Sequence, residues 1–363
     1  MTVAETTARE AYVRRIRDQH LAPLWEALPY LVTAEPKTQI APFHWRYREV
    51  RPTLLESATI ITAKEAERRV LVLENPNLPG QSKITNSLFG GFQLIMPNEV
   101  APPHRHIQAA LRFIIEGSGA YTAVDGERTL MQPGDFVITP SWTFHDHGNH
   151  TSEPMVWLDG LDMHMVRLFE ASFREGWIDE EPIEPTKPEW DALNRYGANM
   201  VPVEHTHRAK TSPVFSYPYD RTREALLALQ KAEAPHAHFG YKMRYINPLT
   251  GGDAIPTIST FMQLLPKGFA TAPYRATDST VFVPVEGTGT TTVGGHTFDW
   301  EPHDIIVVPS WMKYTHTASS DAVIFSYSDR GPQELLGFWR EEKWRPFPTN
   351  AARARAFGST RAT

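Results

Sequence analysis

Three histidines at two points of the chain have the residue type and spacing of a metal site. His104 and His106 stand two residues apart in a β-like run, where alternate side chains share one face, so both imidazoles point the same way. His145 follows a later β-like run, residues 134–140, and brings in an imidazole from a distant strand. Imidazole is a ligand that suits Fe, Zn, Cu and Ni. We therefore expect His104, His106 and His145 to hold one divalent metal ion.

A second copy of the same region serves as an internal control. Residues 113–142 and 282–311 share the pattern E-G-[ST]-G and close in P-S-W. Aligned through these landmarks, His104 corresponds to Tyr274, His106 to Ala276 and His145 to Tyr314. The strand and turn residues remain while the whole histidine set is absent, which indicates that the histidines serve a metal and not the fold. His147 keeps a counterpart in His316, so we do not count it as a ligand.

The composition excludes several other classes of function. The chain has 363 residues, a formal net charge of −6 and no cysteine, so disulfides, thiolate metal sites and cysteine nucleophiles are excluded. It lacks the basic stripe of a nucleic-acid-binding protein. The N-terminus does not have the pattern of a secretory signal, and no apolar run approaches the roughly 18 residues of a membrane span. We therefore expect a soluble, cytoplasmic protein without nucleic-acid or membrane partners.

The elements that must position the histidines are short β-like runs. From about residue 69 they recur at a spacing of roughly ten residues, separated by Gly, Pro and Asn, which is typical of an all-β sandwich or barrel. A second block of this kind covers residues 255–328, and such repetition implies a duplicated barrel. Residues 5–32 have helical spacing, broken at Pro23 and Pro29, and are expected to cover a sheet edge.

We expect an all-β-dominated fold of two tandem jelly-roll barrels with flanking helices. A linker rich in proline and acid at 179–190 and a helix at 221–233 separate the barrels, and the basic tail from Pro346 is expected to fray. The second barrel, without the metal set, is expected to serve packing and assembly. The expected divisions are an N-terminal helical and extended region (1–68), the metal-binding barrel (69–170), a linker with a helix (171–250), the second barrel (251–330) and a C-terminal helix and tail (331–363).

The residues around the histidines resemble the two motifs of the cupin superfamily. The second motif is matched by Gly134, Pro140, His145 and Asn149. Trp142 stands in the place of its second glycine. His104 and His106 match the first motif, but its usual glutamate is missing, because positions 110 and 111 are Ala and Leu. The resemblance implies a bicupin whose three-histidine site has no carboxylate ligand.

Longer runs make the chain similar to the gentisate 1,2-dioxygenase family, which includes salicylate and 1-hydroxy-2-naphthoate ring-cleaving dioxygenases. These runs are ERR (67–69), FGGFQ (89–93), APPHRHIQAALRFIIEGSGAYT (101–122), GDFVITPSWTFHDHGN (134–149), WLDGLD (157–162) and YINPLTGGD (245–253). The similarity covers about residues 20–340. It implies one Fe(II) per chain on three neutral imidazoles, no organic cofactor, and a homotetramer.

The resemblance also implies a reaction. Three imidazoles leave the metal its full charge and open positions for O2 and for the hydroxyl and carboxylate oxygens of an ortho-hydroxy aromatic acid. Both atoms of O2 would enter between the carboxyl-bearing and hydroxyl-bearing ring carbons. Gentisate, opened to maleylpyruvate, is the first expected substrate, because its second hydroxyl makes the ring easier to oxidise.

Several charged residues near the motifs are candidates for binding such an acid. Arg112 follows His106 by six residues and would share its strand face if the run continued, so we expect it to bind the substrate carboxylate. His147 is a candidate general acid or base, because it would lie beside the metal without binding it. Asp159 is a candidate partner that orients His147 or an arginine.

The other candidates for substrate contact come from two earlier runs. Of the pair Arg68 and Arg69, the resemblance favours Arg68. Gln93 could donate to the substrate, and Phe89 lacks the indole donor that family members often carry in this stretch. Gly91 is expected to enlarge the pocket wall, so that a bulkier acid would also fit.

Alternative functions remain open on the sequence alone. Within the same chemistry, the substrate could be salicylate, a nitro- or halosalicylate, or 1-hydroxy-2-naphthoate. A cupin isomerase or hydrolase that uses Zn is a second alternative, which metal analysis and O2 consumption would separate. A bicupin binding or storage protein with a structural metal is the third, and it would not need open metal positions next to Arg112.

Overall fold

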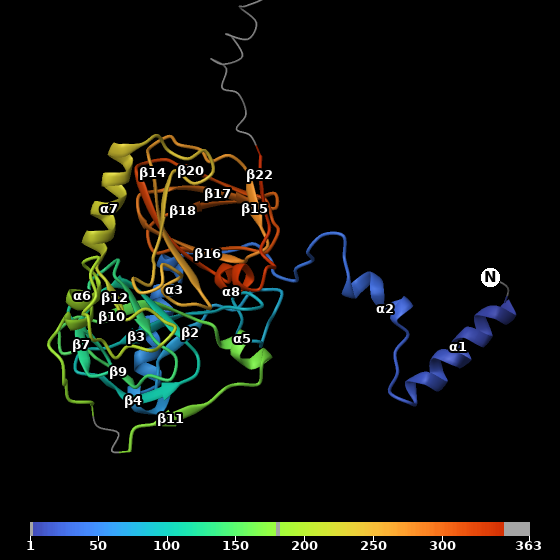
Figure 1. The fold of residues 1–363 in the computed structure, drawn as a ribbon, viewed down its shortest axis with the longest axis horizontal. Helices are drawn as coiled ribbons and strands as arrows, with labels where there is room; N and C mark the ends of the chain where they lie inside the picture. The colour runs from blue at the N-terminus through green and yellow to red at the C-terminus, as the bar shows by residue number, and fades with distance from the viewer. Residues whose placement is uncertain (1–2, 179–181, 345–363) are drawn as a thin grey trace, which may run out of the picture. The chain divides into compact units, whose positions relative to one another are not determined.

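Short strands dominate the computed structural model, which describes residues 3–178 and 182–344 (Figure 1). The basic tail from Pro346 and the linker residues 179–181 lie outside the described residues. The chain divides into two units, Met1–Thr38 and Gln39–Thr363. The second unit contains both barrels.

The N-terminal unit is helical, as its spacing predicts. It contains α1 (Val3–Arg17) and α2 (Leu24–Leu31). Pro23 immediately precedes α2, where a proline is tolerated because the first backbone N–H groups of a helix have no partner inside it. Pro29 was expected to break the helix, but it lies inside α2. Pro29 lies near the end of α2, so the N–H that it lacks removes only one backbone hydrogen bond from the helix.

The first barrel is built from two antiparallel sheets. One sheet has the order β12-β8-β5-β10-β3-β2, and the other has the order β11-β4-β9-β6-β7. The first of these contains β2 (Val70–Val72), β3 (Phe89–Ile95), β5 (Ala110–Glu116), β8 (Phe136–Thr139), β10 (Met155–Leu161) and β12 (Ser216–Tyr217). The second contains β4 (Val100–His106), β6 (Tyr121–Val124), β7 (Glu127–Leu130), β9 (His145–Gly148) and β11 (Arg174–Gly176).

The second barrel repeats this plan, which confirms the duplication predicted from the two E-G-[ST]-G frames. Its sheets have the orders β1-β19-β16-β21-β14-β13 and β18-β17-β20-β15-β22. The strands of the first are β1 (Phe43–Trp45), β13 (Tyr241–Arg244), β14 (Ser259–Leu265), β16 (Thr280–Glu286), β19 (Ile305–Val308) and β21 (Ala322–Ser328). Those of the second are β15 (Tyr274–Ala276), β17 (Gly289–Val293), β18 (His296–Trp300), β20 (Tyr314–Ala318) and β22 (Glu341–Lys343).

Helices connect the strands and cover parts of the barrels. They are α3 (Tyr47–Ile60), α4 (Ala63–Ala66), α5 (Met163–Leu168), α6 (Asp191–Tyr196), α7 (Tyr219–Ala232) and α8 (Arg330–Leu335). Helix α7 is the one that the sequence predicts at 221–233. It lies along the second barrel in Figure 1 and contacts β13 and β14. Among the described residues, none of the helices has the length and apolarity needed to cross a bilayer.

One buried apolar cluster contains residues of both barrels, and a smaller one lies within the second barrel. Phe113 of β5 stacks on Phe325 of β21, with ring centroids 4.2 Å apart and planes 8° from parallel. Tyr327 of β21 reaches further into the first barrel, where its hydroxyl donates to the carbonyl of Phe89 at 3.3 Å. This contact needs the two glycines beside it, because a Cβ at Gly90 or Gly160 would lie within about 3 Å of the Tyr327 side chain. A residue of the second barrel therefore supports two strands of the first.

Candidate metal centre

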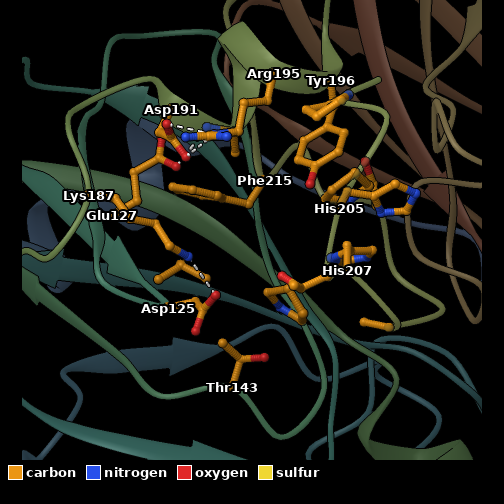
Figure 2. Close-up of a pocket in the computed structure, with 18 of the residues that line it drawn as sticks. Asp125, Glu127, Thr143, Lys187, Asp191, Arg195, Tyr196, His205, His207 and Phe215 are labelled. Carbon is orange, nitrogen blue, oxygen red and sulfur yellow. Dashed lines mark hydrogen bonds and ion pairs between the residues drawn. The ribbon is translucent and has the colours of Figure 1, made fainter. Parts of the chain in front are cut away.

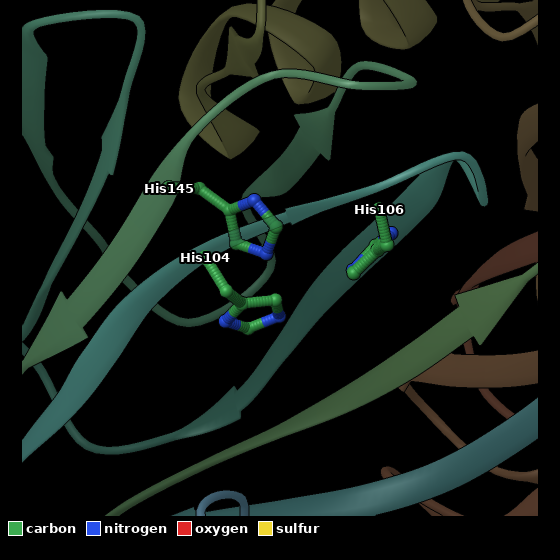
Figure 3. A group of neighbouring side chains, drawn as sticks. All are labelled: His104, His106 and His145. Carbon is green, nitrogen blue, oxygen red and sulfur yellow. The ribbon is translucent and has the colours of Figure 1, made fainter. Parts of the chain in front are cut away.

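The three predicted ligands lie together on neighbouring strands. His104 and His106 come from β4, and His145 comes from β9, where His104 and His145 are directly paired. One ring nitrogen of each lies within 4.8 Å of the others, and Figure 3 shows the three rings side by side. The predicted grouping is confirmed, and it is the only such group of His, Asp and Glu in the described part of the chain.

The other ring nitrogen of each histidine faces a backbone carbonyl. The distances from Nδ1 to the carbonyl oxygen are 2.7 Å for His106 and Gln108, 2.9 Å for His145 and Thr143, and 3.3 Å for His104 and Pro102. A carbonyl only accepts, so Nδ1 of His106 and of His145 carries the hydrogen and their Nε2 atoms keep a free lone pair, while Nδ1 of His104 also faces the guanidinium of Arg68 at 2.6 Å. Backbone carbonyls on the outer nitrogen are the usual support of metal-binding histidines. The donor set therefore fits a divalent metal.

Burial and positive neighbours keep these imidazoles neutral. Burial, and to a smaller extent the charge of Arg68, lowers the pKa of His104 to about 3. Burial likewise lowers the pKa of His106 to about 4 and holds that of His145 well below its usual range. A neutral imidazole is the form that binds metal, because a proton and a metal compete for the same lone pair.

Arg112 reaches this centre by a different route from the one expected. It does not continue the strand of His106, because β4 ends at His106 and β5 begins at Ala110. Arg112 is only 4% exposed, its Nη1 donates to Thr139 Oγ1, and its charge lowers the pKa of His106 and His145. The charge of Arg112 therefore acts on two of the histidines, although the assumed continuous strand was wrong.

Asp159 is the acidic partner of Arg112. The two residues face each other on β5 and β10, with Arg112 Nε 3.6 Å from Asp159 Oδ1. Trp157 Nε1 also donates to Asp159 Oδ1 at 3.0 Å. Burial raises the pKa of Asp159 to about 6, while Arg112 and Trp157 oppose that rise. Of the two partners considered for Asp159, the structure provides the arginine.

Arg68 and Arg69 have separate environments. The Nη2 atom of Arg68 donates to the carbonyl of Pro102 at 2.9 Å and lies 2.6 Å from His104 Nδ1. Arg69 is turned away, because its guanidinium pairs with Glu99 through two contacts of 2.8 Å. The structure thus directs Arg68, and not Arg69, toward the histidines. The guanidinium of Arg68 and the carbonyl of Pro102 both approach His104 Nδ1. His104 can bind a metal through Nε2 only when Nδ1 carries the hydrogen and donates it to Pro102.

His147 is fully buried and has one defined partner. Its Nδ1 lies 3.0 Å from Thr122 Oγ1, and that hydroxyl also donates to Met131 Sδ at 3.2 Å. A thioether only accepts, so Thr122 gives its hydrogen to sulfur and accepts one from His147 Nδ1. The Nε2 atom has no hydrogen-bond partner among the described residues and is left as an acceptor. His316 makes the same contact with Thr291 at 2.8 Å, so the pairing itself does not depend on a metal.

Close relatives identify the chain. Residues 91–161 match the cupin domain family. Over 340 residues the chain is 55% identical to gentisate 1,2 dioxygenase 1 of Aquipseudomonas alcaligenes, which covers 94% of this chain and 98% of that protein. The chain belongs to the gentisate 1,2-dioxygenase family. This confirms the resemblance and makes the protein a ring-cleaving dioxygenase.

More distant members of the gentisate 1,2-dioxygenase family act on other acids. The chain is 38% identical to the 5-aminosalicylate 1,2-dioxygenase of a Comamonas species, over 90% of this chain and 87% of that protein. A solved salicylate 1,2-dioxygenase from Pseudoaminobacter salicylatoxidans, in adducts with gentisate, is 32% identical and has a TM-score of 0.87. That comparison covers 93% of this chain and 94% of the solved one.

In this family member, the wall formed by β3 differs from the sequence expectation. Phe89, Gly91 and Gln93 alternate along β3 and share one face. Gly91 was expected to leave room for a larger substrate, but a Cβ there would lie 2.7 Å from Val70 Cγ1 and 3.1 Å from the carbonyl of Leu71. Strand β2 fills the space, so Gly91 admits Val70 and does not enlarge the pocket. Gln93 is 3% exposed.

The turn before His145 is a feature whose role sequence reasoning missed. Trp142 has a φ of +57°, in the left-handed region that favours glycine, and its N–H donates to the carbonyl of His106 at 2.7 Å. In the second barrel, Trp311 has a φ of +61° and donates to Ala276 at 2.7 Å. The sequence signal was the tryptophan in a glycine position of the motif. In the first barrel, this bond ties the strand of His106 to the turn that precedes His145.

A separate cavity of about 680 Å³ lies between the first barrel and the linker (Figure 2). None of the three histidines lines it. Four of its charged side chains are already paired, Lys187 with Asp125 and Arg195 with Asp191, each at 2.8 Å. The cavity is therefore distinct from the metal centre and leaves these charges little capacity to bind another ion.

Proposed function

We propose that this dioxygenase holds one Fe(II) per chain on His104, His106 and His145 and opens the ring of gentisate to maleylpyruvate. The observation that carries the proposal is a set of three neutral imidazoles beside the buried cation of Arg112. The 55% identical relative named for gentisate supports this substrate. Both atoms of O2 would enter between the carboxyl-bearing and the hydroxyl-bearing ring carbons. When bound, Fe(II) supplies the redox chemistry that O2 needs to react with an aromatic ring.

Two arginines are proposed to bind and orient the substrate carboxylate. Arg112 and Arg68 each act on the pKa of His106 through their charges, so both cations lie near the ligands. A guanidinium in a site from which water is excluded binds a carboxylate strongly, through two parallel hydrogen bonds. Asp159 is proposed to act indirectly, by holding Arg112 in place.

The proposed acid–base group is His147. Its ring lies 5.7 Å from that of His145, centroid to centroid, and its Nε2 is available as an acceptor. This atom could take the proton of the substrate hydroxyl and return it to the product. Gln93 and Phe89 are proposed to form the wall against which the ring packs, together with the backbone of Gly91.

A second candidate substrate class is salicylate and its amino-, nitro- or halo-substituted derivatives. The 5-aminosalicylate relative and the salicylate dioxygenase structure support this alternative, and 1-hydroxy-2-naphthoate extends it to a larger ring. The closed wall at Gly91 favours the single-ring acids, because Val70 occupies the space that a second ring would need there. The Zn-dependent isomerase or hydrolase and the binding-protein alternatives are disfavoured by membership of a dioxygenase family.

The proposed setting is a cytoplasmic homotetramer whose partners are the small acid and O2, without nucleic acid or membrane. The proposed functional division keeps catalysis in residues 69–170 and assembly in residues 251–330. Light scattering coupled to gel filtration measures the assembly, and a mass of four chains would support it.

The test is O2 uptake by Fe(II)-reconstituted protein with gentisate, salicylate and 1-hydroxy-2-naphthoate, with Zn(II)-loaded protein as the control. We expect fastest uptake with gentisate, one O2 per ring-opened acid, and a product two oxygen atoms heavier than the substrate. The Zn(II) protein should be inactive. Faster turnover of salicylate would select the second substrate class, and no uptake at full iron loading would refute the proposal.

A further inference from the structure

The second barrel contains a cavity of about 480 Å³ at the place that corresponds to the metal centre of the first. Tyr274 and Tyr314 line it, and they are paired across β15 and β20 in the same register as His104 and His145 across β4 and β9. A volume of this size is ordinary for a small-molecule site. In the second barrel, two tyrosines and a cavity thus stand where the first barrel has its histidines.

The residues of this cavity do not suit a metal. In the described part of the chain, His and carboxylate groups gather closely enough for an ion only at the three histidines of the first barrel. The hydroxyl of Tyr274 donates to Glu341 at 3.0 Å, so this tyrosine is already engaged. Three basic and two acidic residues line the cavity, which leaves one positive charge in excess. That excess favours an anion.

Lys242 supplies an available cation in the cavity. Its ammonium lies 4.5 Å from the ring centre of Phe261, 5.5 Å from that of Phe239 and 5.8 Å from that of Phe282. It makes no hydrogen bond or ion pair with another described residue, and burial lowers its pKa to about 8. At neutral pH it is therefore largely charged, and its ammonium lies against aromatic faces while the charges of Asp278 and Arg330 act on it in opposite directions, a setting in which a carboxylate can bind.

The acidic residues that line the cavity have other partners. Asp278 accepts hydrogen bonds from Trp339 Nε1 at 2.9 Å and from Thr280 Oγ1 at 3.2 Å. Glu334 pairs with Arg330 at 2.7 Å and with Arg244 at 3.6 Å. Asp278 therefore acts on Lys242 only through its charge, and among the described residues no carboxylate forms an ion pair with Lys242.

A second donor lies in the same cavity. The hydroxyl of Tyr314 makes no hydrogen bond with a described residue, and burial raises its pKa, so it stays protonated and can donate. Phe239 and Phe261 line the cavity as apolar walls. Together these residues offer a charged donor, a neutral donor and two aromatic faces to one ligand.

We infer that this cavity binds a small aromatic monocarboxylate, with its carboxylate on Lys242 and Tyr314 and its ring against Phe239 and Phe261. The site is separate from the metal centre, so the inference does not depend on which acid the enzyme oxidises. Aromatic acids would then bind at two places in each chain, and only the first barrel would transform them.

The first experiment locates the ligand. Crystals of the Zn(II)-loaded full-length protein are soaked with 4-bromobenzoate, and the bromine is placed by its anomalous scattering. We expect a peak in the second barrel with the carboxylate within hydrogen-bond distance of Lys242 Nζ. A peak confined to the first barrel, or no peak at all, would overturn the inference.

The second experiment measures the contribution of Lys242 in solution. Calorimetric titration with 4-bromobenzoate is compared for wild type, Lys242→Met, Lys242→Arg and the control Lys313→Met, which removes an exposed charge next to Tyr314. In Lys242→Met, the affinity of one site per chain for 4-bromobenzoate should fall by about tenfold or more. Lys242→Arg and the control should keep the affinity of wild type. Equal binding by wild type and Lys242→Met would contradict the inference, provided that thermal unfolding shows both variants folded. Phosphate binding as tight as 4-bromobenzoate binding would contradict its aromatic part.

Discussion

The buried pair of Arg112 and Asp159 leads to the most informative prediction. The substitution Asp159→Asn removes the negative charge but keeps an oxygen that can accept from Trp157 Nε1. Arg112 would then be a cation in the interior without a counter-charge. Because both side chains are less than a tenth exposed, solvent cannot replace the missing partner.

The size of the effect follows from the separation. At 3.6 Å and an effective dielectric constant of about 20, the attraction between two unit charges is close to 5 kcal/mol. Desolvation of the pair offsets part of this attraction, and removing one member of a buried pair costs roughly 3–5 kcal/mol. We expect Asp159→Asn to lower the free energy of unfolding by about 3 kcal/mol. The misplaced arginine should lower kcat/KM for gentisate by about tenfold or more.

A double-mutant cycle with Arg112→Met separates this pair from general damage. Urea unfolding at pH 7.5 is measured for wild type, both single variants and the double variant, with O2 uptake in parallel. If the pair acts as a unit, the double variant should be less destabilised than the sum of the singles by about 2 kcal/mol. Additive losses of stability would refute the reasoning, because they would show that the two side chains do not interact.

Three further predictions test other parts of the structure. His145→Ala removes one ligand and should reduce bound Fe(II), measured by elemental analysis, from one per chain to below about a tenth. The circular dichroism spectrum of the metal-free protein should stay unchanged. Full loading of the variant would contradict the three-histidine site. Tyr327→Phe should lower the free energy of unfolding by about 1 kcal/mol and Tyr327→Ala by about 3–5 kcal/mol. The Ala variant should also have a raised KM. An unchanged KM in that variant would show that the barrels act separately. Burial raises the pKa of Asp329 to about 7, so the folded chain keeps a proton that the unfolded chain releases near its ordinary value of 3.8. The free energy of unfolding should therefore fall as the pH rises from about 4 to 7, and Asp329→Asn should flatten that fall in urea titrations, whereas an unchanged slope would assign it to other groups.

The sequence was sufficient for the duplicated fold and for the grouping of the three histidines. The E-G-[ST]-G and P-S-W landmarks lie at strand ends and turns, where a residue type is tied to a backbone conformation, so they survive in both copies. The histidine pair follows the two-residue period of a strand, which holds whatever the neighbours are. Both predictions rested on local rules.

The failures involved a strand end that no residue type marks and contacts between residues that are distant in the sequence. The run from His106 to Arg112 has no Gly or Pro, so nothing in it indicates that the strand ends at His106 and that the carbonyl of Gln108 turns back to its ring. The space beside Gly91 is filled by Val70, from a strand about twenty residues earlier, and no residue next to Gly91 reports this. The pairing of Asp159 with Arg112 depends on the register between β5 and β10, which the sequence does not specify.

The contact between Tyr327 and the carbonyl of Phe89 has a consequence for how such a duplicated enzyme can evolve. Tyr327 belongs to the copy without metal ligands, yet it limits residues 90 and 160 of the other copy to glycine. The copy without metal ligands is therefore constrained in evolution, because a change at position 327 alters which residues can be accepted at positions 90 and 160 of the first barrel. For protein engineers, the useful library for new aromatic acids extends beyond the reacting barrel and includes Tyr327 together with Gly90 and Gly160, varied as one set.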